Sequence, residues 1–113
     1  MDTNAWVNEF QGAVTVCDPQ GIIVEMNDKS AKTFEKDGGR QLIGSNLFAC
    51  HSDASRAKLQ IMIAERQTNV YTIEKNDVKK MIYQSPIYNN GVYAGFVEIS
   101  LEIPFEMPHF IRS

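Results

Sequence analysis

Five short apolar-rich runs have the composition of β-strands, and one long stretch with helical spacing separates the second run from the third. The runs are rich in β-branched and aromatic residues, which favours strands. They cover residues 13–17, 22–26, 70–75, 78–85 and 92–102. The order strand, strand, helical stretch, strand, strand, strand predicts an α+β domain with one antiparallel sheet.

Three segments have the spacing of helices. Residues 3–11 form a short amphipathic segment, and residues 28–36 form a second one that begins after the capping residue Asn27. The main helix is predicted over residues 52–67, with Ser52 as its N-cap. Its core-facing stripe consists of Leu59, Met62 and Ile63.

The segments between the predicted strands contain residues that favour tight turns. Asp18-Pro19-Gln20-Gly21 joins the first two runs, and Asn89-Asn90-Gly91 joins the last two as a hairpin. We therefore expect a flanking helix over residues 1–12, one domain over residues 13–103 and a tail over residues 104–113. The tail is apolar but interrupted by prolines, so we expect it to lie against the domain surface.

Composition narrows the function classes. The chain has 113 residues, 43% hydrophobic content and a net charge of −3, which is typical of one soluble domain. Lysines and arginines are too scattered for a nucleic-acid surface, and no apolar stretch could span a membrane. The N-terminus does not resemble a secretory signal, so we expect a cytoplasmic protein with Cys17 and Cys50 as free thiols.

Several motifs in this order resemble those of the PAS domain family, and the resemblance covers residues 13–102. Residues 16–23 are similar to the family's strand followed by Asp-x-x-Gly-x-Ile. Asn27 and Phe34 match its Asn-to-Phe helix. The remaining matches are Leu42-Ile43-Gly44, Ser85-Pro86 and Gly91-x-x-x-Gly95.

The resemblance implies a five-stranded antiparallel sheet of spatial order 2-1-5-4-3 with helices packed on one face. It also implies a sensory module that binds a small, mostly apolar ligand between helices and sheet. Such modules signal through contacts with a second copy or with a signalling protein in trans. A ligand-free interaction or dimerisation module is the alternative.

The pocket is assigned from strand alternation and family analogy. In the last strand, Val97 and Ile99 are placed inward, and Phe96, Glu98 and Ser100 outward. In the middle strand Ile82 and Gln84 are placed inward, although the reverse register stays open. The predicted pocket residues are Phe34, Ile43, Leu47, Phe48, Leu59, Ile63, Ile82, Gln84, Val97 and Ile99. These side chains could equally fill a solid core.

The opposite face of the sheet is the predicted dimer interface. An exposed apolar patch there would need cover from the first helix, the tail or another subunit. We favour a homodimer in which the first helix takes part. The predicted interface residues are Trp6, Phe10, Tyr83 and Phe96.

Cofactor and catalytic motifs are incomplete. Leu47 stands where flavin photosensors of this family carry a reactive Cys, and Val97 replaces their flavin-reading Gln, which leaves only noncovalent flavin open. His51 could hold haem, the second alternative, although it precedes the main helix. Cys50 and His51 are too few for zinc. Cys50 could be a reactive thiol at the helix N-terminus or an inert buried one. No nucleophile motif or phosphate loop is present, so we expect no enzyme activity.

Overall fold

The computed structural model describes residues 5–47 and 53–113. Its five strands form one antiparallel sheet of order β2-β1-β5-β4-β3, which confirms the predicted order. The strands are β1 (Ala13–Cys17), β2 (Ile23–Met26), β3 (Asn69–Lys75), β4 (Val78–Asn89) and β5 (Val92–Ile103).

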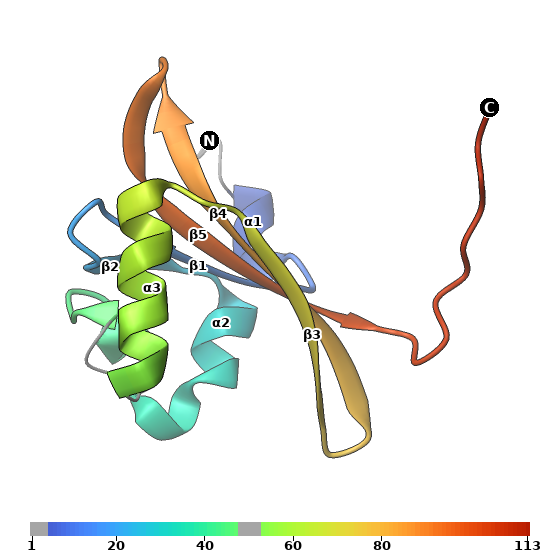
Figure 1. The fold of residues 1–113 in the computed structure, drawn as a ribbon. Coiled ribbons are helices and arrows are strands. Elements are labelled where there is room, and N and C mark those ends of the chain that lie inside the picture. Colours follow the sequence, from blue (N-terminus) through green and yellow to red (C-terminus); the bar gives the residue numbers. More distant parts are fainter. Residues whose placement is uncertain (1–4, 48–52) are drawn as a thin grey trace.

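The helices are α1 (Ala5–Glu9), α2 (Asp28–Thr33) and α3 (Asp53–Glu65), with two 3₁₀ turns, η1 (Glu35–Asp37) and η2 (Gly39–Leu42). Figure 1 shows α2 and α3 on the same side of the sheet. None of the described helices is long and apolar enough to cross a membrane.

The connection between β1 and β2 is fixed by the side chain of Asp18. Its Oδ1 accepts hydrogen bonds from the backbone N–H groups of Gln20 (2.9 Å) and Ile22 (3.0 Å). Gly21 has a φ of 85°, a left-handed conformation that glycine adopts without steric penalty. The Asp-x-x-Gly motif of the sequence is therefore a self-contained turn.

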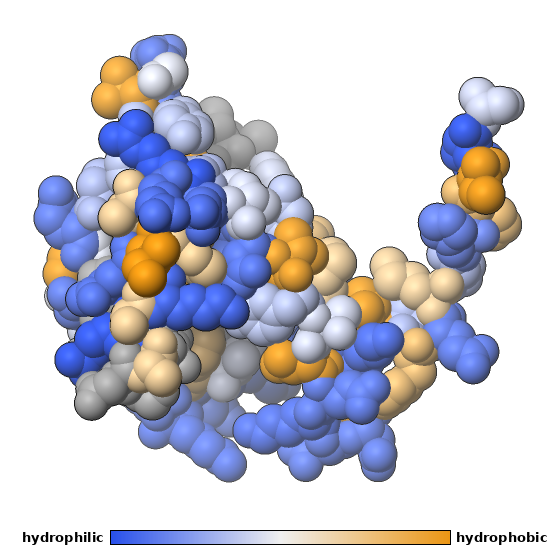
Figure 2. Space-filling model, viewed as in Figure 1, coloured by the Kyte–Doolittle hydropathy of each residue, from blue (hydrophilic) through white to orange (hydrophobic). Residues whose placement is uncertain are grey.

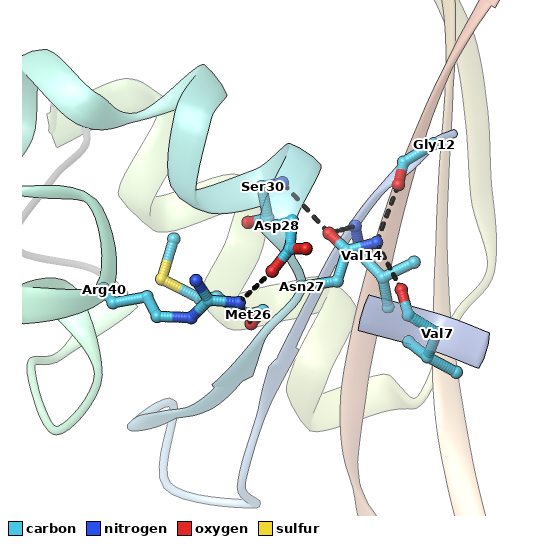
Figure 3. A network of polar contacts seen from close by, with 8 residues as sticks. All are labelled: Val7, Gly12, Val14, Met26, Asn27, Asp28, Ser30 and Arg40. Atoms are coloured by element: carbon cyan, nitrogen blue, oxygen red, sulfur yellow. Dashed lines mark hydrogen bonds and ion pairs between the residues drawn. The ribbon is translucent and has the colours of Figure 1, made fainter. Parts of the chain in front are cut away.

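Asn27 joins three elements at the end of β2 (Figure 3). Its Oδ1 caps α2 by accepting from Ser30 N–H and also accepts from Val14 N–H of β1, both at 2.9 Å. Its Nδ2 donates to the carbonyl oxygens of Val7 (2.9 Å) and Gly12 (2.8 Å). The side chain is 2% exposed, and these four bonds satisfy all of its usual donors and acceptors.

A second polar contact holds η2 beside the start of α2. Arg40 Nη2 lies 2.6 Å from Asp28 Oδ1 in an ion pair (Figure 3). Both side chains are about half exposed, so the pair orients the 3₁₀ turn more than it stabilises the fold.

Gly95 sets how closely β5 approaches β1. Its φ is 134°, and a Cβ atom placed there would lie 2.1 Å from the carbonyl oxygen of Cys17. No side chain fits that gap, so the second glycine of the Gly-x-x-x-Gly motif is a packing requirement. The next residue, Phe96, pairs with Cys17 across the strands.

The hydrophobic core lies between α3 and the sheet. Its buried cluster contains Cys17, Leu59, Met62, Ile63 and Phe96, and half-buried Leu47 packs against it. The three α3 members are the stripe that the sequence predicts as core-facing.

Two parts of the chain differ from expectation. β4 continues past Pro86 to Asn89, because Pro86 pairs with β5 beyond the last residue that β3 pairs. The tail does not lie against the domain. After Lys79 Nζ binds the carbonyl oxygen of Phe105 (3.3 Å), the following residues are exposed, and their apolar side chains extend away from the body (Figures 1 and 2).

Replacing Asn27 tests the junction. In Asn27→Ala four partners lose their hydrogen bonds, and we expect the free energy of unfolding to fall by about 3 kcal/mol. Asn27→Asp keeps two acceptor contacts but cannot donate to the Val7 and Gly12 carbonyls, so we expect a smaller loss, about 2 kcal/mol. Chemical denaturation measures both, with exposed Asn89→Ala as the control. A loss below about 0.5 kcal/mol for Asn27→Ala would show that the junction is not required.

Candidate functional site

The strand register gives the sheet an inner face, toward α2 and α3, and an outer face. Cys17 of β1 and Phe96 of β5 are inner, because they pack with α3. Thr15 is inner as well, since its Oγ1 lies 2.6 Å from Ser30 Oγ of α2. Alternation along the strands then assigns the other residues.

A row of polar side chains crosses the inner face beside the apolar cluster. The paired residues of this polar row are Thr15 in β1, Glu98 in β5, Gln84 in β4 and Asn69 in β3. Asn69 Nδ2 donates to Gln84 Oε1 (3.1 Å), and Gln84 Nε2 donates to Glu98 Oε2 (2.8 Å). Gln84 is 5% exposed, so its amide is desolvated and fully oriented by its two neighbours.

The row beyond it contains Ile82 and Tyr71, which pair across β4 and β3. Burial raises the pKa of Tyr71, and the negative charge of Glu98 raises it further. Tyr71 and Glu98 are therefore close enough to interact electrostatically. Ile82 is buried, so the site has an apolar floor next to a carboxylate, two amides and a phenol.

The outer face is apolar across the three central strands. Val14 pairs with Ile99 and Ile99 with Tyr83, while Val16 pairs with Val97. Tyr83 is 40% exposed. The apolar members of this outer patch are Val14, Val16, Met81, Tyr83, Val97, Ile99 and Leu101.

The predicted phase of the last strand is wrong. Val97 and Ile99 belong to the outer face, not to the pocket. Phe96 is 2% exposed in the α3 cluster and cannot form a dimer surface. Glu98 and Ser100 are inner for the same reason. The Gly95 contact with β1 places Phe96 over Cys17, and this contact fixes the phase of the strand.

Ile43 is also displaced from its predicted place. It is 42% exposed and lines a groove of about 470 Å³ with Val14, Val16 and Val24. Val7 of α1 lines the same groove, which therefore opens on the outer side of the sheet. The reason is that residues 43–46 follow the free edge of β2, as shown by the bond from Gly44 N–H to Ile23 O (2.7 Å).

The other predicted pocket residues divide into three groups. Leu47, Leu59 and Ile63 lie in or against the core cluster, and Ile82 and Gln84 lie on the inner face. Phe34 is half-buried at the C-cap of α2. Phe48, like His51, Cys50 and Ser52, lies outside the described residues.

Three of the four predicted interface residues, Trp6, Phe10 and Tyr83, are exposed. Trp6 and Phe10 stack edge to face, with ring centroids 5.9 Å apart. Phe10 lies next to Leu101 of the outer patch, because a Cβ atom on Gly12 would touch both side chains. The first helix and the outer patch therefore form one continuous apolar surface.

The described residues offer no metal or imidazole site. No group of three or more potential ligands that could hold a metal occurs among them. His109, on the exposed tail, is the one histidine of the described part. Burial and then the charge of Asp18 raise the pKa of Cys17 to about 11, which keeps the thiol protonated and inert at neutral pH.

Sequence reasoning missed Asn69, Tyr71 and Glu98 as site residues. Glu98 was placed on the surface, since its strand is apolar on both sides. The sequence could have predicted Glu98, because the hairpin turn at Asn90-Gly91 sets the register of β4 and β5. That register pairs Glu98 directly with Gln84. Once this pairing is known, β3, β4 and β5 each carry a polar side chain at paired positions of the inner face.

Two substitutions test the assignment of faces. Phe96→Ala leaves a cavity against α3 and should lower the free energy of unfolding by about 3–5 kcal/mol. Val97→Ala removes a half-buried side chain from the outer face and should lower it by about 1 kcal/mol. Urea denaturation at low protein concentration measures both. Equal losses, or a larger loss for Val97→Ala, would reverse the faces.

Comparisons with known proteins identify the fold. No family model matches the chain, and no curated protein matches its sequence. The Aer2 receptor from Vibrio cholerae, described as a dual PAS-heme oxygen sensor, has a TM-score of 0.65 at 16% identity, over 82% of this chain and 95% of that one.

Two further solved structures are similar. The PAS domain of a Colwellia psychrerythraea protein has a TM-score of 0.62 at 20% identity, over 85% of this chain and 89% of that one. The PAS domain of Bordetella pertussis BvgS has a TM-score of 0.62 at 13% identity, over 89% of this chain and 83% of that one. Identities this low establish the fold alone.

Proposed function

We propose that this chain, which has the PAS fold, is a non-enzymatic sensory module that binds a small, mostly apolar molecule on the inner face of its sheet. Its solved neighbours are sensory domains of receptors and histidine kinases. The proposed signal leaves through the outer face, by contact with a second copy or with a signalling protein in trans.

The polar row is the observation that carries the ligand proposal. A core whose only task is stability has no need of a desolvated amide, because burying polar groups gains little even when they are bonded. Here Gln84 is held in one orientation by Asn69 and Glu98, next to apolar residues. An apolar surface with a few oriented polar groups is the usual composition of a small-molecule site.

Haem is not supported by the described residues. The Aer2 receptor is described as a heme sensor, but over the described residues the inner face of the sheet presents carboxylate, amide and phenol groups and no imidazole. His51, the predicted haem ligand, lies outside these residues.

Gln84→Met tests ligand binding, because Met has a similar volume and no amide. Native mass spectrometry of the purified protein, followed by thermal shift against a small-molecule library, should find a ligand for the wild type. We expect Gln84→Met to weaken that ligand at least about tenfold, with a melting temperature close to that of the wild type. Exposed Gln60→Met of α3 is the matched control.

The competing result is also defined. If Gln84→Met loses about 1–3 kcal/mol of stability while the wild type binds no library compound, the row is a structural network. The chain would then be the ligand-free interaction module.

A homodimer through the outer patch is the second part of the proposal. The seven apolar residues of the patch lie on the three central strands, and several of them are only half-buried. Burying this area against a second copy would remove apolar surface from water, which supports pairing of identical subunits through this face. Trp6 and Phe10 extend the same apolar surface.

Tyr83→Glu tests the dimer. Two carboxylates placed in a self-pairing apolar face should weaken dimerisation at least about tenfold, and the monomer should remain folded because Tyr83 is 40% exposed. Sedimentation equilibrium measures the dissociation constant. Val92→Glu, an exposed apolar position outside the patch, is the charge-matched control. A wild type that stays monomeric at high concentration would contradict the proposal.

A further inference from the structure

Glu98 is the one charged side chain of the polar row, and one oxygen of its carboxylate has no hydrogen-bond partner among the described residues. Oε2 accepts the hydrogen bond from Gln84 Nε2 at 2.8 Å. Within the described part of the chain, no donor reaches Oε1. Glu98 is half-buried, so it has lost part of its hydration and recovered one hydrogen bond.

Several cationic side chains of the described residues contact groups other than Glu98. Over residues 5–47 and 53–113, the ion pairs are Lys29 with Glu102 (3.7 Å) and Arg40 with Asp28 (2.6 Å). Arg66 lies over the ring of Tyr93, 4.5 Å from its centroid. The carboxylate of Glu98 therefore has no countercharge from these groups.

An aromatic ring lies on the same inner face, one row from this carboxylate and across β4 from it. Tyr71 is in the neighbouring row of the inner face and is 41% exposed. The charge of Glu98 contributes to the raised pKa of its phenol, which places the two side chains within electrostatic reach. A carboxylate together with an aromatic ring is a combination that binds ammonium and guanidinium groups.

We propose that the molecule recognised on the inner face is a small organic cation, whose ammonium or guanidinium group binds Glu98 Oε1 beside Tyr71 while its apolar part packs against Ile82. The inference rests on the proposed function and gives its ligand a chemical class. Gln84 has the role of a positioning residue, because its amide holds the carboxylate in place from one side and is itself held by Asn69.

The position of Glu98 also indicates the sign of the charge on the proposed ligand. An anion would meet the Glu98 carboxylate, which forms no ion pair within the part of the chain that the structure describes, and like charges in a partly buried site repel. A neutral ligand could donate a hydrogen bond to Oε1 but would leave the charge uncompensated. A cation satisfies both the acceptor and the charge.

Three compounds of one shape separate these cases: benzylammonium, benzyl alcohol and benzoate at pH 7. Titrations followed by amide NMR report affinity and position together. We expect the wild type to bind benzylammonium at least about tenfold more tightly than the alcohol, with shifts at Tyr71, Gln84 and Glu98. Glu98→Gln, which keeps the shape and removes the charge, should reduce that ratio to within about twofold. Exposed Glu25→Gln on the outer face should keep the wild-type ratio.

Each other outcome overturns the inference. Equal or tighter binding of the alcohol or of benzoate, shifts confined to other residues, or an unchanged ratio in Glu98→Gln would exclude cation recognition at this carboxylate. The proposed function fails separately. A neutral ligand that binds the wild type, loses affinity in Gln84→Met and keeps it in Glu98→Gln would leave the sensory site intact and remove only the cation.

Discussion

The fold depends on one buried amide. Asn27 accepts from β1 and α2 and donates to the carbonyl groups of Val7 and Gly12, so a single side chain connects α1, β1, β2 and α2. No other polar residue of similar size offers two donors and two acceptors at the same geometry except glutamine, whose longer side chain would displace the oxygen. The junction also brings α1 to the outer side of the sheet while α2 covers the inner side. The relation between the two faces is therefore fixed where the first strand begins.

The two faces of the sheet differ in the groups whose interactions are not satisfied within the chain. On the inner face, the apolar cluster around Phe96 is closed by α3, but the adjacent polar row has an oriented amide and a carboxylate with one oxygen that no described residue pairs. On the outer face, the incomplete group is the apolar area of the outer patch. A ligand that binds the row would contact β3, β4 and β5 at once, and two of these strands, β4 and β5, also carry outer patch residues on their other side. This common backbone provides a short physical connection between ligand binding and subunit contact.

The sequence predicts the turns and the strand order well, because these depend on local chemistry. Asp18 and Gly21 form the expected turn, and Asn27 caps the helix that follows it. The phase of β5 was not predictable in the same way. Val97, Ile99 and Leu101 form the more apolar alternate set, which favours placing them in the core. The structure reverses this: Phe96 pairs with Cys17 and packs in the α3 cluster, directly after the close approach of Gly95 to Cys17 O.

The same reversal explains which site residues could be found. Gln84 was recoverable, since a buried amide in a middle strand needs a partner. Glu98 was not, because its assignment depended on the phase of its own strand. Asn69 was missed because the pattern placed the start of this edge strand at residue 70. Only the observed pairing of Asn69 with Gln84 assigns it to the site. Tyr83 of the outer patch was predicted, whereas Val97 and Ile99 were assigned to the pocket, since a half-buried apolar face has the pattern of a core face.

A crystal structure of the protein with its co-purified or added ligand tests the account most directly. The account places the ligand against Glu98, Gln84 and Asn69 on the inner face, with the outer patch buried against a second copy. A ligand bound instead in the groove of Val14 and Ile43, or a polar row covered entirely by the protein's own side chains, would contradict it.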